Sequence, residues 1–160
     1  MTQIRSLTAL ATKILVLALV LAGAAWAADS NVGTWKLNTA KSTYSPGPAP
    51  KSNSVTIVAV DNGIHLTADG VDAAGNPTHV EYTAKYDGQD SPVTGVAYAD
   101  TVALKRIDAN TVESTMKKAG TPVMTVRATV SPDGKTRTAV FTGKNEKGED
   151  INNTAVYDKK

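Results

Sequence analysis

The sequence of 160 residues contains no cysteine. This absence excludes disulfide bonds, thiolate nucleophiles and cysteine metal ligands. It also excludes the acylated cysteine by which bacterial lipoproteins attach to a membrane. A folded domain in this chain must therefore hold together through its core alone.

Histidine is nearly absent, because the sequence has only His65 and His79. Matching the apolar faces of the two strands that carry them leaves two registers. In either register His79 lies opposite a residue about 13–20 Å along the strand from His65, so we predict that the two cannot share a metal ion. One register sets Asp69 opposite His79, and the other sets Asp69 opposite Glu81, a pair of like charges. We favour the first and expect a surface charge pair rather than a catalytic dyad.

Motifs for catalysis are missing as well. No serine lies in a G-x-S-x-G elbow or in another nucleophile motif. The acid-rich turns at 69–72 and 146–150 lack the alternating ligand spacing of a calcium loop. The sequence therefore predicts no catalytic residue, no metal site and no cofactor, and we expect a protein that is not an enzyme.

Only one long apolar run occurs, over residues 14–25. It follows two basic residues and precedes the small-residue triplet Ala25-Trp26-Ala27, which is the organisation of a secretory signal peptide. The run is shorter than the roughly 20 residues that a membrane-spanning helix needs. We predict cleavage after Ala27, so that residues 1–27 are a signal peptide. Residues 28–160 would then form one periplasmic or secreted domain with no stable membrane anchor.

Neither sign of charge is in excess in this predicted mature domain. The 17 basic residues include Arg5 and Lys13, and without these two the basic residues equal the 15 acidic ones in number. No basic stripe remains that would attract nucleic acid or an anionic membrane surface. We therefore predict no nucleic-acid partner, and the sequence does not indicate a protein partner.

What the mature part does contain is period-two alternation of Val, Thr, Ile and Tyr between turn signals, with no sustained helical period. We expect strands at 33–38, 54–60, 64–70, 78–86, 96–98, 101–107, 112–118, 122–130, 137–143 and 151–158. The predicted fold class is all-β, an antiparallel up-and-down meander of about 8–10 strands that closes into a barrel. A flattened β-sandwich is the alternative. The proline-rich segment 39–52 should be an extended loop and is a candidate lid.

The register of the first hairpin follows from requiring that apolar residues on neighbouring strands share a face. A two-residue turn at Asn62-Gly63 pairs Ala59 with Leu66 and Ile57 with Ala68. This pairing directs the apolar residues of both strands to the same side of the sheet.

The same requirement favours a three-residue loop at 119–121, which places Met116 opposite Met124 and Ser114 opposite Val126. Oppositely charged neighbours then follow one another across the outer face. This ladder consists of Lys105, Glu113 and Arg127.

Many positions on the predicted inner face carry small side chains. They are Ala59, Ala68, Ala84, Ala128, Ala139, Ala155 and Ser114. Because protein interiors are close-packed, either two parts of the sheet approach closely at these positions, or a barrel of ordinary width is left with unfilled volume. The second explanation provides a cavity for an apolar ligand.

Both ends of the mature part resemble the calycin superfamily, which includes lipocalins and fatty-acid-binding proteins. The chain reads Val-Gly-Thr-Trp-Lys-Leu at 32–37 and Thr-Ala-Val-Tyr-Asp-Lys at 154–159, whereas calycins have a G-x-W in the first strand and a tyrosine near the end of the last. The resemblance implies an up-and-down barrel with a ligand cavity, closed at one end by Trp35. Fatty-acid-binding proteins have a helical pair in place of segment 39–52 and an arginine in place of Ala155. The sequence therefore looks most like an exported bacterial lipocalin-like protein of unsettled function.

The main functional hypothesis is a binding protein for a small hydrophobic ligand. The residues predicted to contact it are Leu66, Tyr82, Leu104, Arg106, Met116, Met124, Val126 and Phe141. Arg106 is the charged member, placed on the inner face opposite Val112. It could meet a ligand carboxylate at the barrel mouth, or simply reach water with its stem on apolar surface.

The other hypothesis is an envelope structural or interaction protein with a packed interior and no ligand. Val58 and Val60 favour it, because both are apolar on the face opposite Ile57.

Overall fold

The computed structural model describes residues 29–145 and 147–160, so the predicted signal peptide lies outside the described residues. The described chain forms ten strands and one 3-10 turn. They are β1 (Gly33–Leu37), η1 (Thr39–Lys41), β2 (Ser52–Val60), β3 (Gly63–Val71), β4 (Pro77–Lys85), β5 (Asp87–Thr94), β6 (Thr101–Arg106), β7 (Thr111–Lys118), β8 (Thr121–Val130), β9 (Thr136–Lys144) and β10 (Asp150–Lys159).

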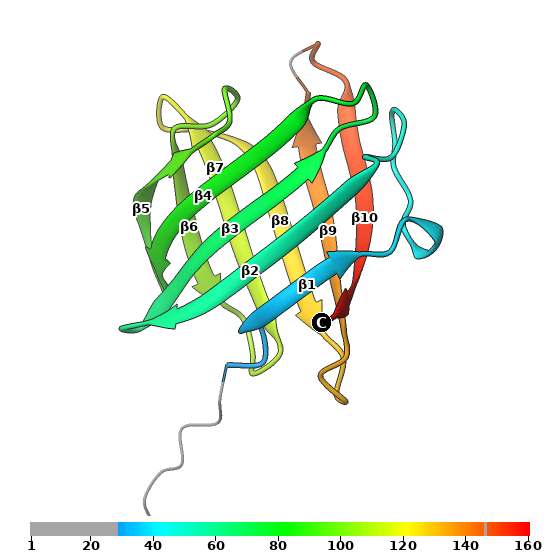
Figure 1. The fold of residues 1–160 in the computed structure, drawn as a ribbon. Helices are drawn as coiled ribbons and strands as arrows, with labels where there is room; N and C mark the ends of the chain where they lie inside the picture. Colours follow the sequence, from blue (N-terminus) through cyan, green and yellow to red (C-terminus); the bar gives the residue numbers. More distant parts are fainter. Residues whose placement is uncertain (1–28, 146) are drawn as a thin grey trace, which may run out of the picture.

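The sheet is a closed antiparallel barrel in which consecutive strands pair and β1 closes on β10 (Figure 1). This confirms the predicted meander and its closure, in preference to the flattened sandwich. No helix among the described residues is long and apolar enough to cross a membrane.

The core is the inner face of this barrel, because successive side chains of a strand point to opposite faces. In β8, for example, Val126, Ala128 and Val130 are buried while Arg127 and Thr129 are exposed. Among the largest fully buried side chains are Trp35, Ile57, Ile64, Val102, Leu104 and Val130. Burial of this continuous apolar surface is what stabilises a domain that has no disulfides.

The registers predicted for β6, β7 and β8 are confirmed. Met116 lies opposite Met124, Ser114 opposite Val126, and Glu113 lies between Lys105 and Arg127. The connection itself is tighter than expected. The turn has two residues, Ala119 and Gly120, both with positive φ. A bulge then shifts the register by one residue between Lys117 and Met116, so that the pairs from Met116 onward are those predicted.

The register predicted for β2 and β3 is wrong by two residues. Ile57 pairs with Leu66 and Val55 with Ala68, because the turn consists of Asp61 and Asn62 rather than Asn62 and Gly63. Asn62 adopts the positive φ. The face of every side chain is unchanged, since a shift of two residues preserves the alternation.

The short strand predicted at 96–98 is also wrong, because the fifth strand is β5. Its first four residues are exposed and Val93 is its one buried residue, so the apolar alternation that reveals a strand is missing. Pairing to β6 holds it in place, with a bulge between Asp87 and Asp90. The residues at 96–98 belong to the loop that follows Gly95, whose φ is positive.

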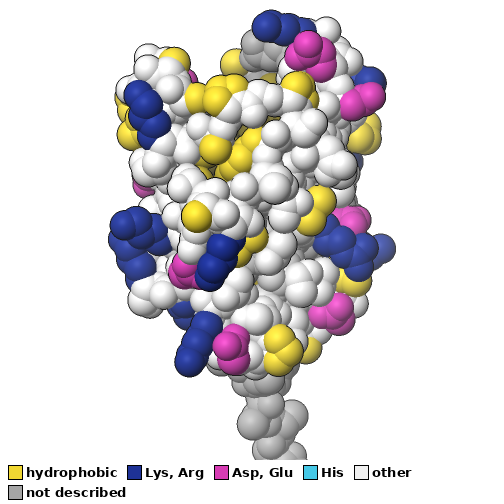
Figure 2. Space-filling model, turned by 90° about the vertical axis from the view of Figure 1, so that its right-hand side faces the viewer, with side chains coloured by type: hydrophobic (Ala, Val, Ile, Leu, Met, Phe, Trp, Pro, Cys, Tyr) yellow, Lys and Arg dark blue, Asp and Glu magenta, His cyan; other side chains and the backbone are white. Residues whose placement is uncertain are grey.

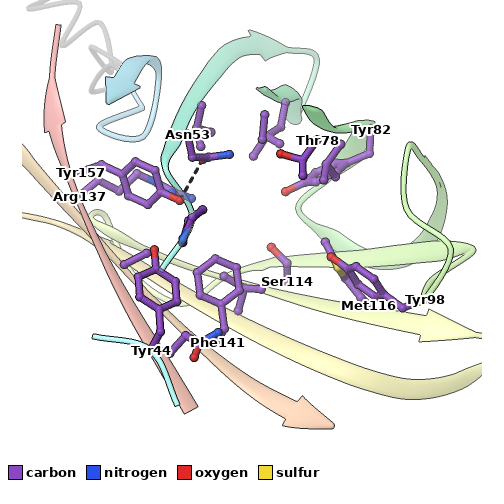
Figure 3. Close-up of a pocket in the computed structure, with 18 residues that line it drawn as sticks. Tyr44, Asn53, Thr78, Tyr82, Tyr98, Ser114, Met116, Arg137, Phe141 and Tyr157 are labelled. Carbon is purple, nitrogen blue, oxygen red and sulfur yellow. Dashed lines mark hydrogen bonds between the residues drawn. The ribbon is translucent and has the colours of Figure 1, made fainter. Parts of the chain in front are cut away.

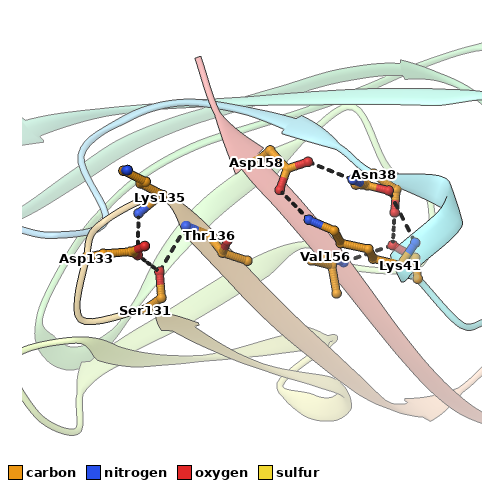
Figure 4. A network of polar contacts seen from close by, with 9 residues as sticks. Asn38, Lys41, Ser131, Asp133, Lys135, Thr136, Val156 and Asp158 are labelled. Carbon is orange, nitrogen blue, oxygen red and sulfur yellow. Dashed lines mark hydrogen bonds and ion pairs between the residues drawn. The ribbon is translucent and has the colours of Figure 1, made fainter.

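The proline-rich segment runs as expected in an extended course, except for the single turn η1. It lies along β10 and is held there by reciprocal backbone hydrogen bonds of 2.8 Å between Thr43 and Thr154. Side chains add to this attachment: Asn38 and Lys41 both bind Asp158, and the Ser42 hydroxyl accepts from the Val156 amide (Figure 4). The segment thus continues along β10 beyond the end of β1, where the two strands close the barrel.

The two ends of the barrel differ. The chain termini of the described barrel and the β2–β3, β6–β7 and β8–β9 turns lie at the lower end in Figure 1. The β3–β4, β7–β8 and β9–β10 turns lie at the upper end, together with the proline-rich segment and the loop between β5 and β6.

Candidate ligand-binding site

A cavity of about 270 Å³ lies inside the barrel. Eighteen residues line it: Tyr44, Pro50, Asn53, Val55, Leu66, Ala68, Thr78, Val80, Tyr82, Tyr98, Ser114, Met116, Val126, Arg137, Phe141, Asn153, Ala155 and Tyr157. Tyr44 and Pro50 come from the proline-rich segment and Tyr98 from the β5–β6 loop, so the cavity opens toward the upper end of the barrel. Figure 2 shows a hollow with hydrophobic side chains in this upper part of the molecule.

The cavity wall is rich in aromatic rings. Five of the seven aromatic residues in the described part of the chain line it: Tyr44, Tyr82, Tyr98, Phe141 and Tyr157. Figure 3 shows Tyr44, Phe141 and Tyr157 on one side of the space and Tyr82 and Tyr98 on the other, with Ser114 between the two groups. Such a wall offers flat apolar surfaces together with a few phenol hydroxyl groups, which is typical of a small-molecule site.

Small side chains provide the room for this cavity. Ala155 lies opposite Ala139, which lies opposite Ala128, so one row across three neighbouring strands carries only methyl groups. Ala155 itself lines the cavity. Of the seven small residues predicted on the inner face, Ala68, Ser114 and Ala155 line the cavity, and unfilled volume explains these three. Ala84, Ala128 and Ala139 are buried without lining the cavity, which fits close packing, and Ala59 is exposed.

The adjacent row toward the lower end carries Val130, Arg137 and Tyr157. Arg137 is only 7% exposed and lines the cavity. Its guanidinium carbon lies 5.8 Å from the centre of the Tyr157 ring, and its Nε is buried without a hydrogen-bond partner. Burial lowers the pKa of Arg137, yet a guanidinium keeps its charge in proteins. The deep end of the cavity is thus positively charged.

Tyr157 is the polar neighbour of this charge. Its hydroxyl donates a hydrogen bond of 3.1 Å to Oδ1 of Asn53 on β2 (Figure 3). Burial raises the pKa of Tyr157 to about 12, against the opposing effect of Arg137. The phenol therefore stays protonated and remains a hydrogen-bond donor at neutral pH.

The structure brings together five of the eight residues predicted to contact a ligand. Leu66, Tyr82, Met116, Val126 and Phe141 all line the cavity. They come from five different strands, β3, β4, β7, β8 and β9, and share one face because each occupies an inward position of the alternation.

The other three predicted residues lie elsewhere. Leu104 is fully buried in the core but does not reach the cavity. Met124 contributes to an adjoining hollow, which shares Tyr98 with the cavity and also includes Lys144 and Ile151. Matching the apolar faces of neighbouring strands predicts that a side chain points into the barrel, but not how far along the barrel axis it lies. This axial position explains why Leu104 and Met124 do not line the cavity.

Arg106 lies opposite Val112 as predicted, but its strand ends at the lower end of the barrel, not at the mouth. Its guanidinium lies 4.1 Å from the centre of the Tyr86 ring and donates to the carboxylate of Asp29. The Tyr86 hydroxyl donates to the same carboxylate. In this lower cluster of Asp29, Tyr86 and Arg106, the carboxylate of Asp29 neutralises the charge of Arg106. Arg106 is therefore not available to bind a ligand carboxylate.

Trp35 lies at the same closed end, as the resemblance implies. Its side chain is fully buried and its indole nitrogen donates a hydrogen bond of 2.8 Å to the carbonyl of Asn31. Residues 29–32 therefore pack against the lower end of the barrel, opposite the opening of the cavity.

The sequence also contains lining residues that face matching overlooked. Arg137, Asn53, Thr78 and Asn153 occupy the same inward parity as Ala139, Val55, Val80 and Ala155, but they are polar. Period two alone, continued from Phe141 and Ala139, would have placed Arg137 inward. Tyr44 had no comparable signal, since it lies in an irregular segment.

On the outer face, the predicted Asp69–His79 pair is present, with 2.7 Å between a carboxylate oxygen of Asp69 and Nδ1 of His79. Glu81 lies 3.5 Å from His65 and 3.4 Å from His79. Within the described ranges, no group of three or more His, Cys, Asp or Glu residues has a geometry that could hold a metal ion.

The fold is consistent with the barrel of the calycin superfamily, in strand order, strand direction and the position of Trp35. No family model, curated protein or solved structure matches this chain.

Proposed function

We propose that this protein is an exported, lipocalin-like binding protein that holds a small, largely apolar ligand inside its barrel. The observation that supports this proposal is the cavity inside the barrel. Protein interiors are close-packed, and unfilled apolar volume forfeits dispersion contacts on every side. A volume of about 270 Å³ is close to the lower limit of ordinary ligand pockets, roughly 300–1,000 Å³, and fits a ligand smaller than most drugs.

Export is part of this proposal and is supported by the signal-peptide pattern of residues 1–27. Cleavage after Ala27 leaves Asp29, which binds Arg106 and Tyr86, within the mature chain. A periplasmic or secreted location follows from that pattern.

We further propose binding rather than catalysis at this site. Ser114 and Thr78 are the hydroxyl side chains of the cavity wall other than the tyrosines. Activation of a hydroxyl as a nucleophile requires an oriented base beside it. Both histidines lie on the outer face of the barrel, where they contact carboxylates.

A neutral fluorescent probe, 1-aminoanthracene, tests the binding proposal on the purified protein. We expect a saturable, one-to-one increase in fluorescence. Ala68→Phe should abolish it, because Ala68 lines the cavity. Thr67→Phe is the matched control, since Thr67 is the neighbour on the same strand whose side chain points outward. Absence of probe binding to the unmodified protein, or equal binding by both variants, would refute the proposal.

One observation favours the second candidate, an envelope interaction protein. Val58 and Val60 on the outer face of β2 are 52% and 38% exposed. Exposed apolar side chains that adjoin one another are a feature of association surfaces. Sedimentation would decide this: a monodisperse monomer that co-purifies with no envelope protein contradicts it, whereas self-association that is lost in Val58→Lys supports it.

A further inference from the structure

Arg137 is a buried charge that the protein itself does not neutralise. It is 7% exposed, and no described carboxylate lies within ion-pair distance of it. The eighteen residues that line the cavity include no aspartate or glutamate, so the wall carries a single charge, which is positive. Burying an ion without a partner is among the most unfavourable events in folding.

The Tyr157 ring does not remove this requirement. A cation over a ring face gains electrostatic attraction, but the ring accepts no ordinary hydrogen bond from the N–H groups of the guanidinium. The Nε of Arg137 is buried and has no partner in the protein. A buried donor without a partner calls for an explanation, such as a bound water, an ion or a ligand. Asn31 also has unpaired buried amide atoms, but only Arg137 combines an unpaired donor with a charge and with the wall of the cavity.

Arg106 is a guanidinium in the same barrel whose contacts are all within the protein, and it serves as a comparison for Arg137. Its charge is neutralised by Asp29, and its face is covered by the Tyr86 ring. Arg137 has the ring but lacks the acid. The group missing from its surroundings is an anion, and the space beside it is the cavity.

We propose that the ligand is a small organic anion whose carboxylate is bound by Arg137 at the deep end of the cavity. A planar carboxylate matches the fork of N–H donors that a guanidinium presents. The apolar body of the ligand then lies among the aromatic rings nearer the opening, including Tyr82 and Phe141. This inference rests on the proposed function and specifies the chemical class of its ligand.

Displacement of 1-aminoanthracene by two molecules of equal shape tests the inference. One is 2-naphthoate, which is an anion, and the other is its neutral amide, 2-naphthamide. We expect the unmodified protein to bind 2-naphthoate about tenfold to a hundredfold more tightly, the effect of hydrogen bonds to a charged group. In Arg137→Gln this preference should vanish, while 1-aminoanthracene still binds and thereby reports an intact barrel.

Arg106→Gln is the matched control and should keep the preference for 2-naphthoate, because Arg106 lies outside the cavity. A second measurement needs no variant of Arg137. In ¹⁵N spectra of the unmodified protein, 2-naphthoate should shift the Nε–H signal of one arginine, and 2-naphthamide should not.

The outcomes separate the two proposals. If 1-aminoanthracene does not bind, the proposed function fails. If it binds but 2-naphthoate and 2-naphthamide displace it equally well, or if Arg137→Gln keeps the preference, the inference about the anion fails while the binding function stands.

Discussion

Arg106 is half-buried and Arg137 is buried in the same barrel, and the two guanidinium groups also differ in whether an acid lies beside them. Both lie beside a tyrosine ring, at 4.1 Å for Arg106 and 5.8 Å for Arg137. Arg106 also binds a carboxylate, that of Asp29. At the scale of the residue, the presence of that acid determines whether the arginine stabilises the ligand-free protein or opposes its folding.

We therefore expect opposite effects from the same substitution at the two positions. Arg137→Met should raise the free energy of unfolding of the ligand-free protein by about 1–3 kcal/mol, because it replaces an unpaired buried charge with an apolar side chain. Arg106→Met should lower it by a similar amount, because it leaves Asp29 without its cation. Urea unfolding measures both. A clear loss of stability in Arg137→Met would show that its charge is already compensated.

At the scale of the element, the β2–β3 hairpin shows why a glycine beside a turn need not be the turn residue. Asn62 adopts the positive φ, whereas Gly63 is the first residue of β3. A Cβ at Gly63 would lie 2.1 Å from the carbonyl oxygen of Ala84 on β4. Gly63 is thus required by the close approach of a neighbouring strand, which no pattern within the hairpin reveals.

Gly63→Ala should lower the free energy of unfolding by about 2 kcal/mol or more, because the clash is with backbone and forces β3 and β4 apart. Gly134→Ala is the comparison. Gly134 has φ of +70° in the open β8–β9 turn, where a Cβ would meet nothing within 4 Å. Only the strain of a left-handed alanine, about 1 kcal/mol, applies there. Equal losses in urea unfolding of the two variants would contradict this account of Gly63.

At the scale of the whole molecule, the closed end depends on a segment that belongs to no strand. Asp29 precedes β1, yet its carboxylate accepts hydrogen bonds from Tyr86 after β4 and from Arg106 at the end of β6. Burial disfavours the charged carboxylate, but these bonds and the one from the Asn31 amide outweigh it, so the pKa of Asp29 lies below its ordinary value. The segment joins parts of the barrel that are distant in sequence.

Asp29→Asn should therefore destabilise the protein at neutral pH by about 1–3 kcal/mol, the effect of removing charge-assisted hydrogen bonds. A carboxyl whose pKa is lowered by folding contributes stability above its unfolded pKa and loses that contribution as the pH falls through its folded pKa. The difference between the variant and the unmodified protein should accordingly shrink in strongly acidic solution. Thermal unfolding as a function of pH measures it, and a difference that persists unchanged at low pH would contradict the assignment.

Much of the fold could be predicted because alternation is a local property. The inward parity of Leu66, Tyr82, Met116, Val126 and Phe141 follows from period two, and all five line the cavity. The β2–β3 register was wrong by two residues, yet every face stayed right, because only an odd shift reverses the alternation. β5 was misplaced because its exposed polar residues carry no such signal.

The sequence by itself determined the all-β meander and the side of the sheet that its apolar residues face, but it left a flattened sandwich as the alternative to a closed barrel. Only the tertiary structure decided the height of each side chain along the barrel, and with it the partners of each charge. Arg106 and Arg137 both point inward by parity, but one meets Asp29 at the closed end and the other meets the cavity. Height depends on strand stagger, tilt and the course of the connecting segments around a closed sheet, which are properties of all ten strands together.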